Sequence, residues 1–418
     1  MAFNGSPPTL PRQSGAAHAV SRRSFIGGAV ACTLAYTTVY AAQGRHTGRL
    51  LAYVGTDTKP VDGTAWGKGI YLYEVDAATG DLSLLRLAAE TPSPSWLTLH
   101  PSGRFLYSVN EIRDYEGNSG SITAFAIDRG TGALRPLNTV SSHGAGPAHM
   151  SLDASGNYAF VANYFGGSIA VLPIHPDGSL ASAVFVHRDE GSLGSLHAAS
   201  APPGSFAISG HDAPHAHMIL TDPANRFVLQ TDLAQDRIYT YRFDAATGQL
   251  TPAQTPFVAL PSGDGPRHFA FHPNSRWLYS IQEEASTVVF FHYDTATGAL
   301  APRQTISTLP HGFTGSNFCS EILISSDGRF LYAANRLHNS IAVFAIAADG
   351  RLRFLADTWT EGDYPSNMSM GPDGRFLYVG NQRSDSITSF RINRQTGLLT
   401  FTGRYDPLGT PMHMVFLG

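Results

Sequence analysis

The sequence predicts an all-β protein, a seven-bladed β-propeller with four-stranded blades, because two repeats interleave along the chain. The first repeat is a turn followed by an apolar strand, as in HPSGRFLYSVNE (100–111) and SSDGRFLYAANR (325–336). Its copies recur every 50 residues or so, the period of propeller blades (roughly 40–50 residues). The second repeat alternates apolar residues with a period of two and then turns on TG or DG, as in GSITAFAIDRGTGAL (120–134). Seven copies of this second repeat occur.

Each repeat unit holds about four strands, which is the content of one propeller blade. An opening strand such as WLTLH (96–100) precedes the GRFLY-type strand, and the alternating strand and a strand after the TG turn follow. The C-terminal PMHMVFLG (411–418) resembles an opening strand without a partner, and LLAYVGT (50–56) resembles that missing partner. We therefore expect the two ends of the chain to share one blade and close the ring, which leaves no open sheet edge.

The N-terminal segment differs from the repeats. Arg22 and Arg23 precede a short, weakly apolar stretch that ends in small residues near Ala41 and Ala42, the layout of a twin-arginine export signal. We expect residues 1–44 to be a signal peptide with a flexible N-terminus and residues 45–418 to be a single propeller domain. A membrane anchor is the alternative, but the weak hydropathy favours removal. The mature protein is then periplasmic or secreted, has the twin-arginine export machinery as a partner, and has no stable membrane span.

Net charge and cysteine content argue against nucleic-acid binding and against stabilisation by a disulfide. The formal net charge is −4, which argues against nucleic acid as a partner, because phosphate binding needs a basic face. Only Cys319 would remain after signal removal, so we expect no internal disulfide despite the oxidising compartment. Stability must then come from the core and the sheet ladders.

Counting back from the arginine of each GRFLY-type repeat compares the opening strands, which line the central channel of a propeller. Polar and titratable residues gather at two adjacent levels, where each strand enters the channel. We expect them to converge at one end of the channel, because a bare scaffold has no reason to gather such groups there. Nine residues back are Ser95, Ala148, His217, Arg267, Ser320 and Ser366. Eight residues back are Trp96, His149, Met218, His268, Glu321 and Asn367.

The residue types at these levels limit the chemistry. No Ser–His–Asp order and no G-x-S-x-G motif supports a serine nucleophile, and Cys319 shows no pairing with a histidine. Histidine, arginine and a carboxylate around a polar hole suit the addition of water to an activated carbonyl. A His or Glu takes a proton from water while Arg267 stabilises the oxyanion or binds a substrate carboxylate. The long connection 187–213 should lie beside the mouth as a lid. We predict the catalytic residues His149, Arg267 and Glu321, and the substrate-binding residues His215, His217, His268, Asn367 and Arg336.

The motifs GPAHMSLD (146–153), PHAHMI (214–219), GPRHFAFHPN (265–274) and CSEI (319–322) resemble those of the seven-bladed lactonase family. That family includes bacterial 6-phosphogluconolactonases and fungal carboxymuconate cyclases, and the resemblance covers residues 50–418. It implies hydrolysis of a lactone or the related lactone-forming cyclisation. It also implies roles for the residues that match its P-x-H, P-H-x-H, G-P-R-H and A-E-I motifs: His149, His215, His217, Arg267, His268 and Glu321.

The sequence departs from the family pattern at one place. Gly210 and His211 stand where many members carry Arg-Gln, so an arginine expected to bind an anion is missing, for which Arg188 or Arg336 could substitute. This departure and the export signal count against 6-phosphogluconolactone. We therefore expect a lactonase that acts on an unphosphorylated sugar lactone or a small organic lactone.

Other functions stay open at this level. A cycloisomerase acting on a muconate-type dicarboxylate would use the same site with at least two cationic anchors. A non-catalytic binding propeller is a further alternative, although it should have bland, interchangeable strand mouths. No cofactor or metal is expected. In a metal-assisted variant, Glu321, Asn367 and a histidine would surround a divalent cation.

Overall fold

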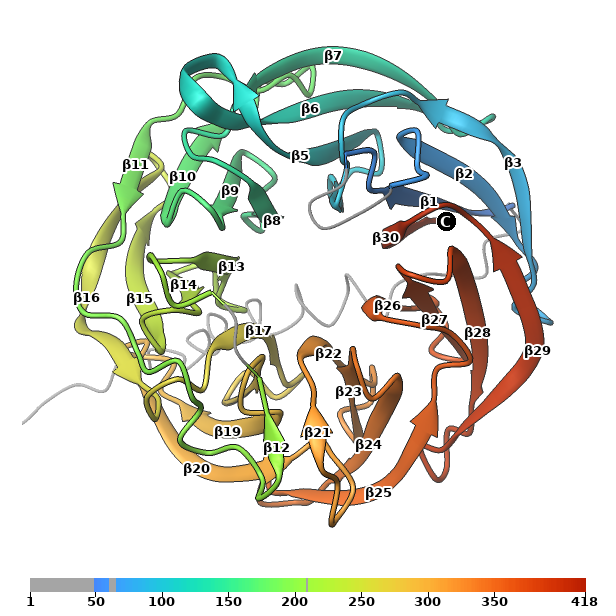
Figure 1. Ribbon diagram of the computed structural model, residues 1–418. Coiled ribbons are helices and arrows are strands. Elements are labelled where there is room, and N and C mark those ends of the chain that lie inside the picture. Colours follow the sequence, from blue (N-terminus) through green and yellow to red (C-terminus); the bar gives the residue numbers. More distant parts are fainter. Residues whose placement is uncertain (1–48, 60–64, 208–209) are drawn as a thin grey trace, which may run out of the picture.

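The computed structural model describes residues 49–59, 65–207 and 210–418, so the expected signal peptide lies outside the described residues. Seven four-stranded antiparallel sheets surround a central axis, as Figure 1 shows. The predicted seven-bladed propeller is therefore confirmed. In every sheet the innermost strand is the opening strand of the repeat, and the strand after the TG or DG turn is outermost.

The strands of the first four blades follow the order of the chain, from the axis outwards. Blade 1 consists of β4 (Trp96–Leu99), β5 (Phe105–Tyr115), β6 (Ser119–Asp128) and β7 (Ala133–Ser141), with the short 3-10 helix η1 (Glu116–Asn118) between β5 and β6. Blade 2 consists of β8 (Pro147–Leu152), β9 (Tyr158–Asn163), β10 (Ser168–Pro173) and β11 (Phe185–Arg188). Blade 3 consists of β13 (Ala216–Thr221), β14 (Phe227–Asp232), β15 (Arg237–Asp244) and β16 (Gln249–Ala259). Blade 4 consists of β17 (Pro266–Phe271), β18 (Trp277–Gln282), β19 (Thr287–Tyr293) and β20 (Leu300–Ser307).

The remaining blades include the one that joins the two ends of the chain. Blade 5 consists of β22 (Cys319–Ile324), β23 (Phe330–Asn335), β24 (Ser340–Ile346) and β25 (Leu352–Trp359). Blade 6 consists of β26 (Pro365–Met370), β27 (Phe376–Asn381), β28 (Ser386–Ile392) and β29 (Leu399–Pro407). Blade 7 consists of β30 (Pro411–Leu417), β1 (Leu50–Thr56), β2 (Ile70–Val75) and β3 (Leu82–Ala89). A separate two-stranded sheet consists of β12 (Ser205–Phe206) and β21 (Gly315–Ser316).

Blade 7 closes the ring as the sequence predicts. β30 pairs antiparallel with β1, with Leu51 opposite Leu417 and Val54 opposite Met414. Residues from the two ends of the described chain thus supply adjacent strands of one sheet. The pairing satisfies the backbone groups of β1, which would otherwise form an exposed edge.

The two sequence repeats interlock between neighbouring blades. The tyrosine of a GRFLY-type strand donates its hydroxyl to the backbone carbonyl of the turn glycine in the next blade. Tyr107 does so to Gly178 at 3.0 Å, and Tyr53, Tyr279 and Tyr332 repeat the contact in three other blades. Gly178 has a φ of 88°, and a Cβ there would lie 2.3 Å from the Phe105 ring. The turn therefore requires glycine, and the contact joins adjacent blades around the ring.

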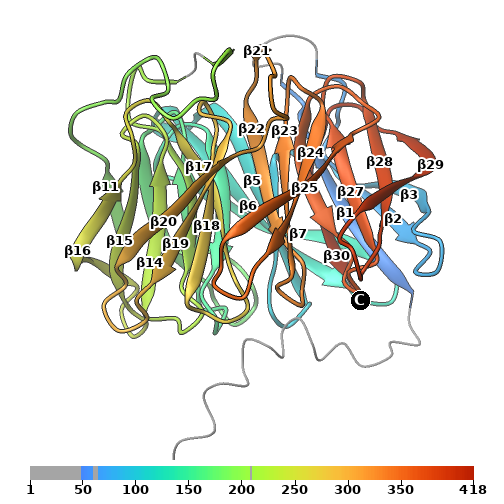
Figure 2. The same ribbon diagram turned by 90° about the horizontal axis from the view of Figure 1, so that it is seen from below.

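The two ends of the propeller are distinct. Figure 2 shows β21 at one end and the C-terminus at the opposite end. β22 begins shortly after β21, whereas β30 ends at the C-terminus, so the inner strands begin on the side of β21. We call this end the mouth. In the described part of the chain, no helix is long and apolar enough to cross a membrane.

Candidate active site

A β-bulge at the mouth end of the inner strands directs adjacent side chains into the site. In β17, Pro266 lies opposite Gln282 and Phe269 lies opposite Ser280, which leaves one extra residue on the inner strand. The same irregularity occurs in β8, β13, β22, β26 and β30. A bulge re-aims a side chain that regular alternation would send to the other face. Arg267 and His268 are consecutive, yet Nη1 of Arg267 lies 3.4 Å from Nε2 of His268.

Seven side chains, one from each inner strand, occupy the same level just inside the mouth, and we call them the core ring. Trp96 stacks on His413 with ring centroids 3.7 Å apart and lies 4.4 Å from His149 and 5.4 Å from His268. Because these rings come from blades 7, 1, 2 and 4, they fill the axis where the sequence suggested a polar hole. They form the floor of the mouth. The core ring comprises Trp96, His149, Met218, His268, Glu321, Asn367 and His413.

A buried imidazole–carboxylate pair stands in the core ring. His268 and Glu321 are 2% and 5% exposed, and Nδ1 of His268 lies 3.1 Å from each carboxylate oxygen of Glu321. The Glu321 carboxylate also accepts the backbone N–H of Ile322 at 2.9 Å and Nδ2 of Asn367 at 2.9 Å. Two oxygens facing Nδ1 favour the tautomer with the proton on Nδ1, which leaves a lone pair on Nε2. That lone pair lies beside Arg267.

Two guanidiniums share one carboxylate next to this pair. Oε2 of Glu283 lies 2.9 Å from Nε of Arg267 and 2.6 Å from Nη2 of Arg336. Backbone carbonyls hold both arginines, since Arg267 donates to Ser320 at 2.7 Å and Arg336 donates to Cys319 at 2.9 Å. The cluster has two positive charges and one paired negative charge. Arg188, the other cation that the sequence suggested, lies exposed on β11, the strand of blade 2 farthest from the axis.

A second ring of equivalent residues surrounds the mouth, and we call it the rim ring. Each member follows directly after the second strand of its blade, except Glu111, which lies within the longer β5. Each donates its backbone N–H to a carbonyl before the inner strand. The distances run from 2.7 Å for Glu283 to Gly265 to 3.0 Å for Gln382 to Tyr364. The rim ring comprises Asp57, Glu111, Tyr164, Leu233, Glu283, Arg336 and Gln382.

Four residues of the two rings, Trp96, Glu111, Glu283 and His413, are not among the predicted site residues, although their positions in the repeats could have identified them. Glu111 and Glu283 are the last residues of the GRFLY-type repeats, the same position that identifies Arg336. His413 follows from counting the register through the unpaired C-terminal strand, and Trp96 already stood at the level of His149. A comparison of the opening strands alone cannot identify the rim ring, because the mouth is built from two strands in each blade.

Burial dominates the electrostatics of the floor. It lowers the pKa of His149, His217 and His268 well below the usual histidine value, and it lowers the pKa of His413 to about 4. These imidazoles are therefore neutral in neutral solution. Burial raises the pKa of Glu321 to about 7, although the hydrogen bond from Ile322 and the charge of Arg267 oppose it.

The two histidines of PHAH meet at one tyrosine. The ring of His215 stacks on Tyr164 at 4.3 Å, and its two nitrogens lie 2.9 Å from the Tyr164 carbonyl and 3.0 Å from Asp212 Oδ1. The His217 ring contacts the edge of Tyr164 at 5.4 Å and of His268 at 4.9 Å. His217 thus joins the site directly, whereas both ring nitrogens of His215 are occupied and His215 supports Tyr164.

The long connection 187–213, which we call the strap, crosses the mouth end of blades 3 and 4. Its backbone bonds to the loops of blade 3, for example from Ala199 to Ser262 at 3.0 Å, and β12 then pairs with β21 next to blade 5. On its return, His211 is buried with its ring nitrogens 3.9 Å from carboxylate oxygens of Asp236 and Glu284. At its start, Asp189 accepts a hydrogen bond from Gln230 at 2.6 Å.

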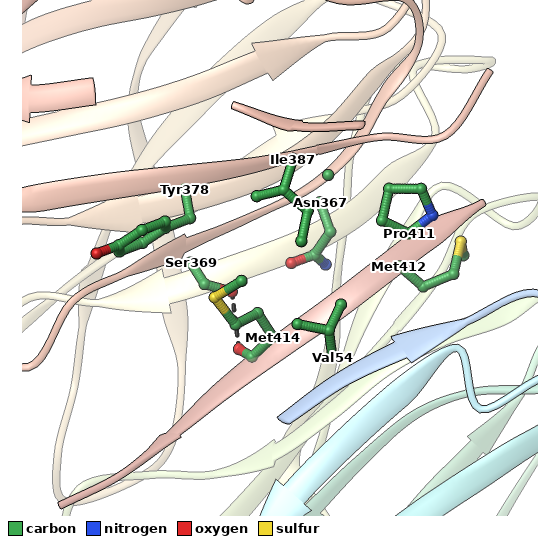
Figure 3. A pocket seen from close by; sticks show the side chains of 9 residues that line it. Val54, Asn367, Ser369, Tyr378, Ile387, Pro411, Met412 and Met414 are labelled. Carbon is green, nitrogen blue, oxygen red and sulfur yellow. Dashed lines mark hydrogen bonds between the residues drawn. The ribbon is translucent and has the colours of Figure 1, made fainter. Parts of the chain in front are cut away.

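Other candidate sites are less suited to chemistry. Cys319 is buried against Thr308 and Asn335, and burial raises its pKa to about 12, which makes it a poor nucleophile. Across the described ranges, no group of three or more His, Cys, Asp or Glu side chains is placed to hold a metal ion. Figure 3 shows a small crevice between blades 6 and 7 that touches the core ring through Asn367. Its lining contains no carboxylate, imidazole or guanidinium.

Comparisons with known proteins agree with the fold. The family model "Lactonase, 7-bladed beta-propeller" matches residues 51–416, and the chain belongs to this family. The 6-phosphogluconolactonase of Bacillus subtilis is 32% identical over 308 residues, 73% of this chain and 81% of the relative. The 6-phosphogluconolactonase of Pectobacterium carotovorum is 30% identical over 273 residues, 65% of this chain and 73% of the relative.

A solved structure has the same fold. The periplasmic gluconolactonase of Pseudomonas aeruginosa superimposes with a TM-score of 0.78 at 32% identity, covering 89% of this chain and 99% of the other. Lactone hydrolysis is thus the chemistry of the named relatives on this fold.

Proposed function

We propose that the chain is an exported lactonase that hydrolyses an unphosphorylated sugar lactone or a small organic lactone at the mouth. The observation that carries the proposal is the buried Glu321–His268 pair beside Arg267. Membership of the lactonase family and the gluconolactonase named among the structural relatives support it. The twin-arginine pattern at Arg22 and Arg23, together with the periplasmic relative, supports a periplasmic location.

His268 is the general base in this mechanism. Its Nδ1–H donates to Glu321, so the lone pair of Nε2 takes a proton from the attacking water. Burial and the nearby charge of Arg267 keep the pKa of His268 low, so Nε2 stays unprotonated and accepts the N–H of Arg267 until the attacking water takes its place. The Glu321 carboxylate stabilises the imidazolium that forms. His149 accepts the backbone N–H of Ile219 at Nδ1, so it positions the floor instead of moving the proton.

Arg267 and Arg336 stabilise the oxyanion. Attack of water on the lactone carbonyl places a negative charge on the carbonyl oxygen, and guanidinium N–H groups are strong donors to such an oxygen. The carbonyls of Ser320 and Cys319 and the shared carboxylate of Glu283 hold the two guanidiniums in place before substrate arrives. Little reorganisation is therefore needed in the transition state.

The charge balance of the mouth favours a substrate without a phosphate. Glu283 offsets one of the two positive charges, and the rim ring adds the carboxyl group of Asp57. A neutral lactone needs no counter-charge there, whereas a dianionic phosphate meets a guanidinium pair that Glu283 has already half neutralised. The absence of a side chain at Gly210 agrees with this preference.

The cycloisomerase keeps one supporting observation. Arg336 lies beside Arg267, which supplies the two cationic anchors that a muconate-type dicarboxylate needs. Glu283 weakens this alternative, because it already occupies both anchors.

The test is to assay the purified protein with glucono-1,5-lactone, 6-phosphogluconolactone and a muconate. We expect hydrolysis of the neutral lactone, with a loss of about 10²-fold or more in Arg267→Ala and Glu321→Gln. Hydrolysis no faster than by either variant rejects the enzymatic proposal and leaves the binding propeller. Conversion of the muconate alone favours the cycloisomerase. We propose no cofactor; loss of activity with a chelator would instead assign a divalent cation to Glu321, Asn367 and a histidine.

A further inference from the structure

Glu111 is a carboxyl group at the mouth that the mechanism above does not use. It is the rim-ring residue of blade 1 and donates its backbone N–H to Ser93 at 2.9 Å. Glu283 makes the equivalent bond to Gly265 at 2.7 Å in blade 4. The two glutamates therefore occupy the same level and approach the mouth from different blades.

The surroundings of Glu111 differ from those of the other carboxylates at the mouth. Two arginines hold Glu283, whereas Glu111 makes no ion pair within the part of the chain that the structure describes. The Ser95 hydroxyl lies beside its carboxyl group, and the nearby charged groups are Asp57 on one side and Arg267 and Arg113 on the other. Glu111 thus lies within electrostatic reach of Arg267 without being tied to it.

Burial raises the pKa of both Glu111 and Glu321, but the hydrogen-bond partners of the two carboxyl groups differ. Burial raises the pKa of Glu111 to about 7; Ser95, Arg267 and Arg113 oppose the rise and Asp57 adds to it. Glu321 accepts hydrogen bonds from Ile322, Asn367 and His268, all of which favour its ionised form. Glu111 has no such set of donors to stabilise the ionised form. Glu321 is thus held as the counter-ion of His268, whereas Glu111 keeps its proton available for a substrate.

We propose that Glu111 is the general acid that protonates the leaving ring oxygen of the lactone. This inference rests on the proposed hydrolysis. When the tetrahedral intermediate collapses, the bond from the carbonyl carbon to the ring oxygen breaks and its electron pair goes to that oxygen. The oxygen takes the proton of Glu111 and becomes the hydroxyl of the product. His268 releases the proton it took from water, and Glu111 regains one from solvent, so water is the only co-reactant.

The test compares two leaving groups. Glucono-1,5-lactone expels an alkoxide, which needs a proton, whereas dihydrocoumarin expels a phenolate, whose conjugate acid has a pKa of about 10. We expect Glu111→Gln to slow hydrolysis of the first by roughly 10²-fold or more and of the second by less than about 10-fold. Glu321→Gln should slow both alike. Glu116→Gln, at an exposed glutamate of η1 in the same blade, serves as the matched control and should show no difference between the substrates.

Equal effects of Glu111→Gln on both lactones, or no effect on either, overturn the inference and leave the lactonase intact. A wild-type protein that hydrolyses neither lactone overturns the proposed function itself. If Glu111→Gln does not fold, the wild-type pH profiles decide. With spontaneous hydrolysis subtracted, the rate on the alkoxide-leaving lactone should fall above about pH 7. The rate on dihydrocoumarin should not fall in this range. The same pH profile for both lactones would contradict the role of Glu111 as general acid.

Discussion

Nδ1 of His268 lies 3.1 Å from both carboxylate oxygens of Glu321, and both side chains are almost fully buried. The pair comes from inner strands of adjacent blades, β17 and β22. On the other side of the imidazole, Nε2 lies 3.4 Å from Nη1 of Arg267, the proposed oxyanion donor. The catalytic arrangement thus depends on two strands that meet only at the axis of the propeller.

Replacing Glu321 by glutamine should lower kcat by about 10²- to 10⁴-fold with little change in KM, because the neutral amide cannot stabilise the His268 imidazolium. Burial raises the pKa of Glu321 to about 7, so the wild-type rate on dihydrocoumarin, which does not depend on Glu111, should rise as pH increases through about 7, where the Glu321 carboxyl ionises. The variant should lose this acidic limb. Steady-state kinetics from pH 5 to 9 provide the check, with Glu190→Gln on the exposed strap as control. An unchanged acidic limb would assign it to another group.

Replacing Arg267 by alanine should cost roughly 10²- to 10³-fold in kcat, the usual effect of removing an oxyanion donor. Arg267→Lys should restore only part of the rate, because an ammonium cannot bond to Glu283 and Ser320 with the same planar geometry. Arg188→Ala on the exposed outer strand is the matched control and should leave kcat unchanged. Full rescue by lysine would show that charge alone is required.

Replacing Glu283 by glutamine should shift the substrate preference of the mouth from neutral towards anionic lactones. Two guanidiniums lose their shared counter-charge, so binding of an anionic lactone should improve relative to a neutral one, by about 10-fold or more in the ratio of their KM values. The melting temperature should fall, because Arg267 and Arg336 then repel each other in a buried position. Enzyme kinetics with glucono-1,5-lactone and 6-phosphogluconolactone give the ratio. A constant ratio would mean that Glu283 does not set substrate charge.

Replacing Asp189 by asparagine should make stability less dependent on pH. Burial, followed by the charge of Asp232, raises the pKa of Asp189 to about 9. The folded protein therefore keeps a proton that the unfolded chain loses, and this stabilising effect is present at low pH and lost as the pH rises toward 9. The wild-type free energy of unfolding should decline between pH 7 and 9 by at most about 1.4 kcal/mol per pH unit, and the decline should flatten in the variant. Urea unfolding at several pH values measures how the free energy of unfolding depends on pH. An equal slope in both proteins would contradict the retention of a proton by Asp189 in the folded state.

The two sequence repeats predicted the fold because each repeat shows where a strand runs and where it turns. A period of two decides which side chains face the neighbouring blade, and the TG and DG turns mark where each strand reverses. The tyrosine–glycine contacts between blades, such as Tyr107 to Gly178, explain why the two repeats occur together. The same register placed His149, Arg267, His268, Glu321 and Asn367 at one end of the axis.

The sequence by itself therefore determined the number of blades, the closure of the ring and the two levels of polar residues, because these follow from local periodicity repeated seven times. Only the tertiary structure decided the partners: Glu283 shared by Arg267 and Arg336, and His268 on Glu321. Ring closure brings together strands far apart in the chain, and the bulges turn adjacent residues to the same side. Neither effect leaves a trace in the spacing within one blade, so these partners became visible only when the ring was complete.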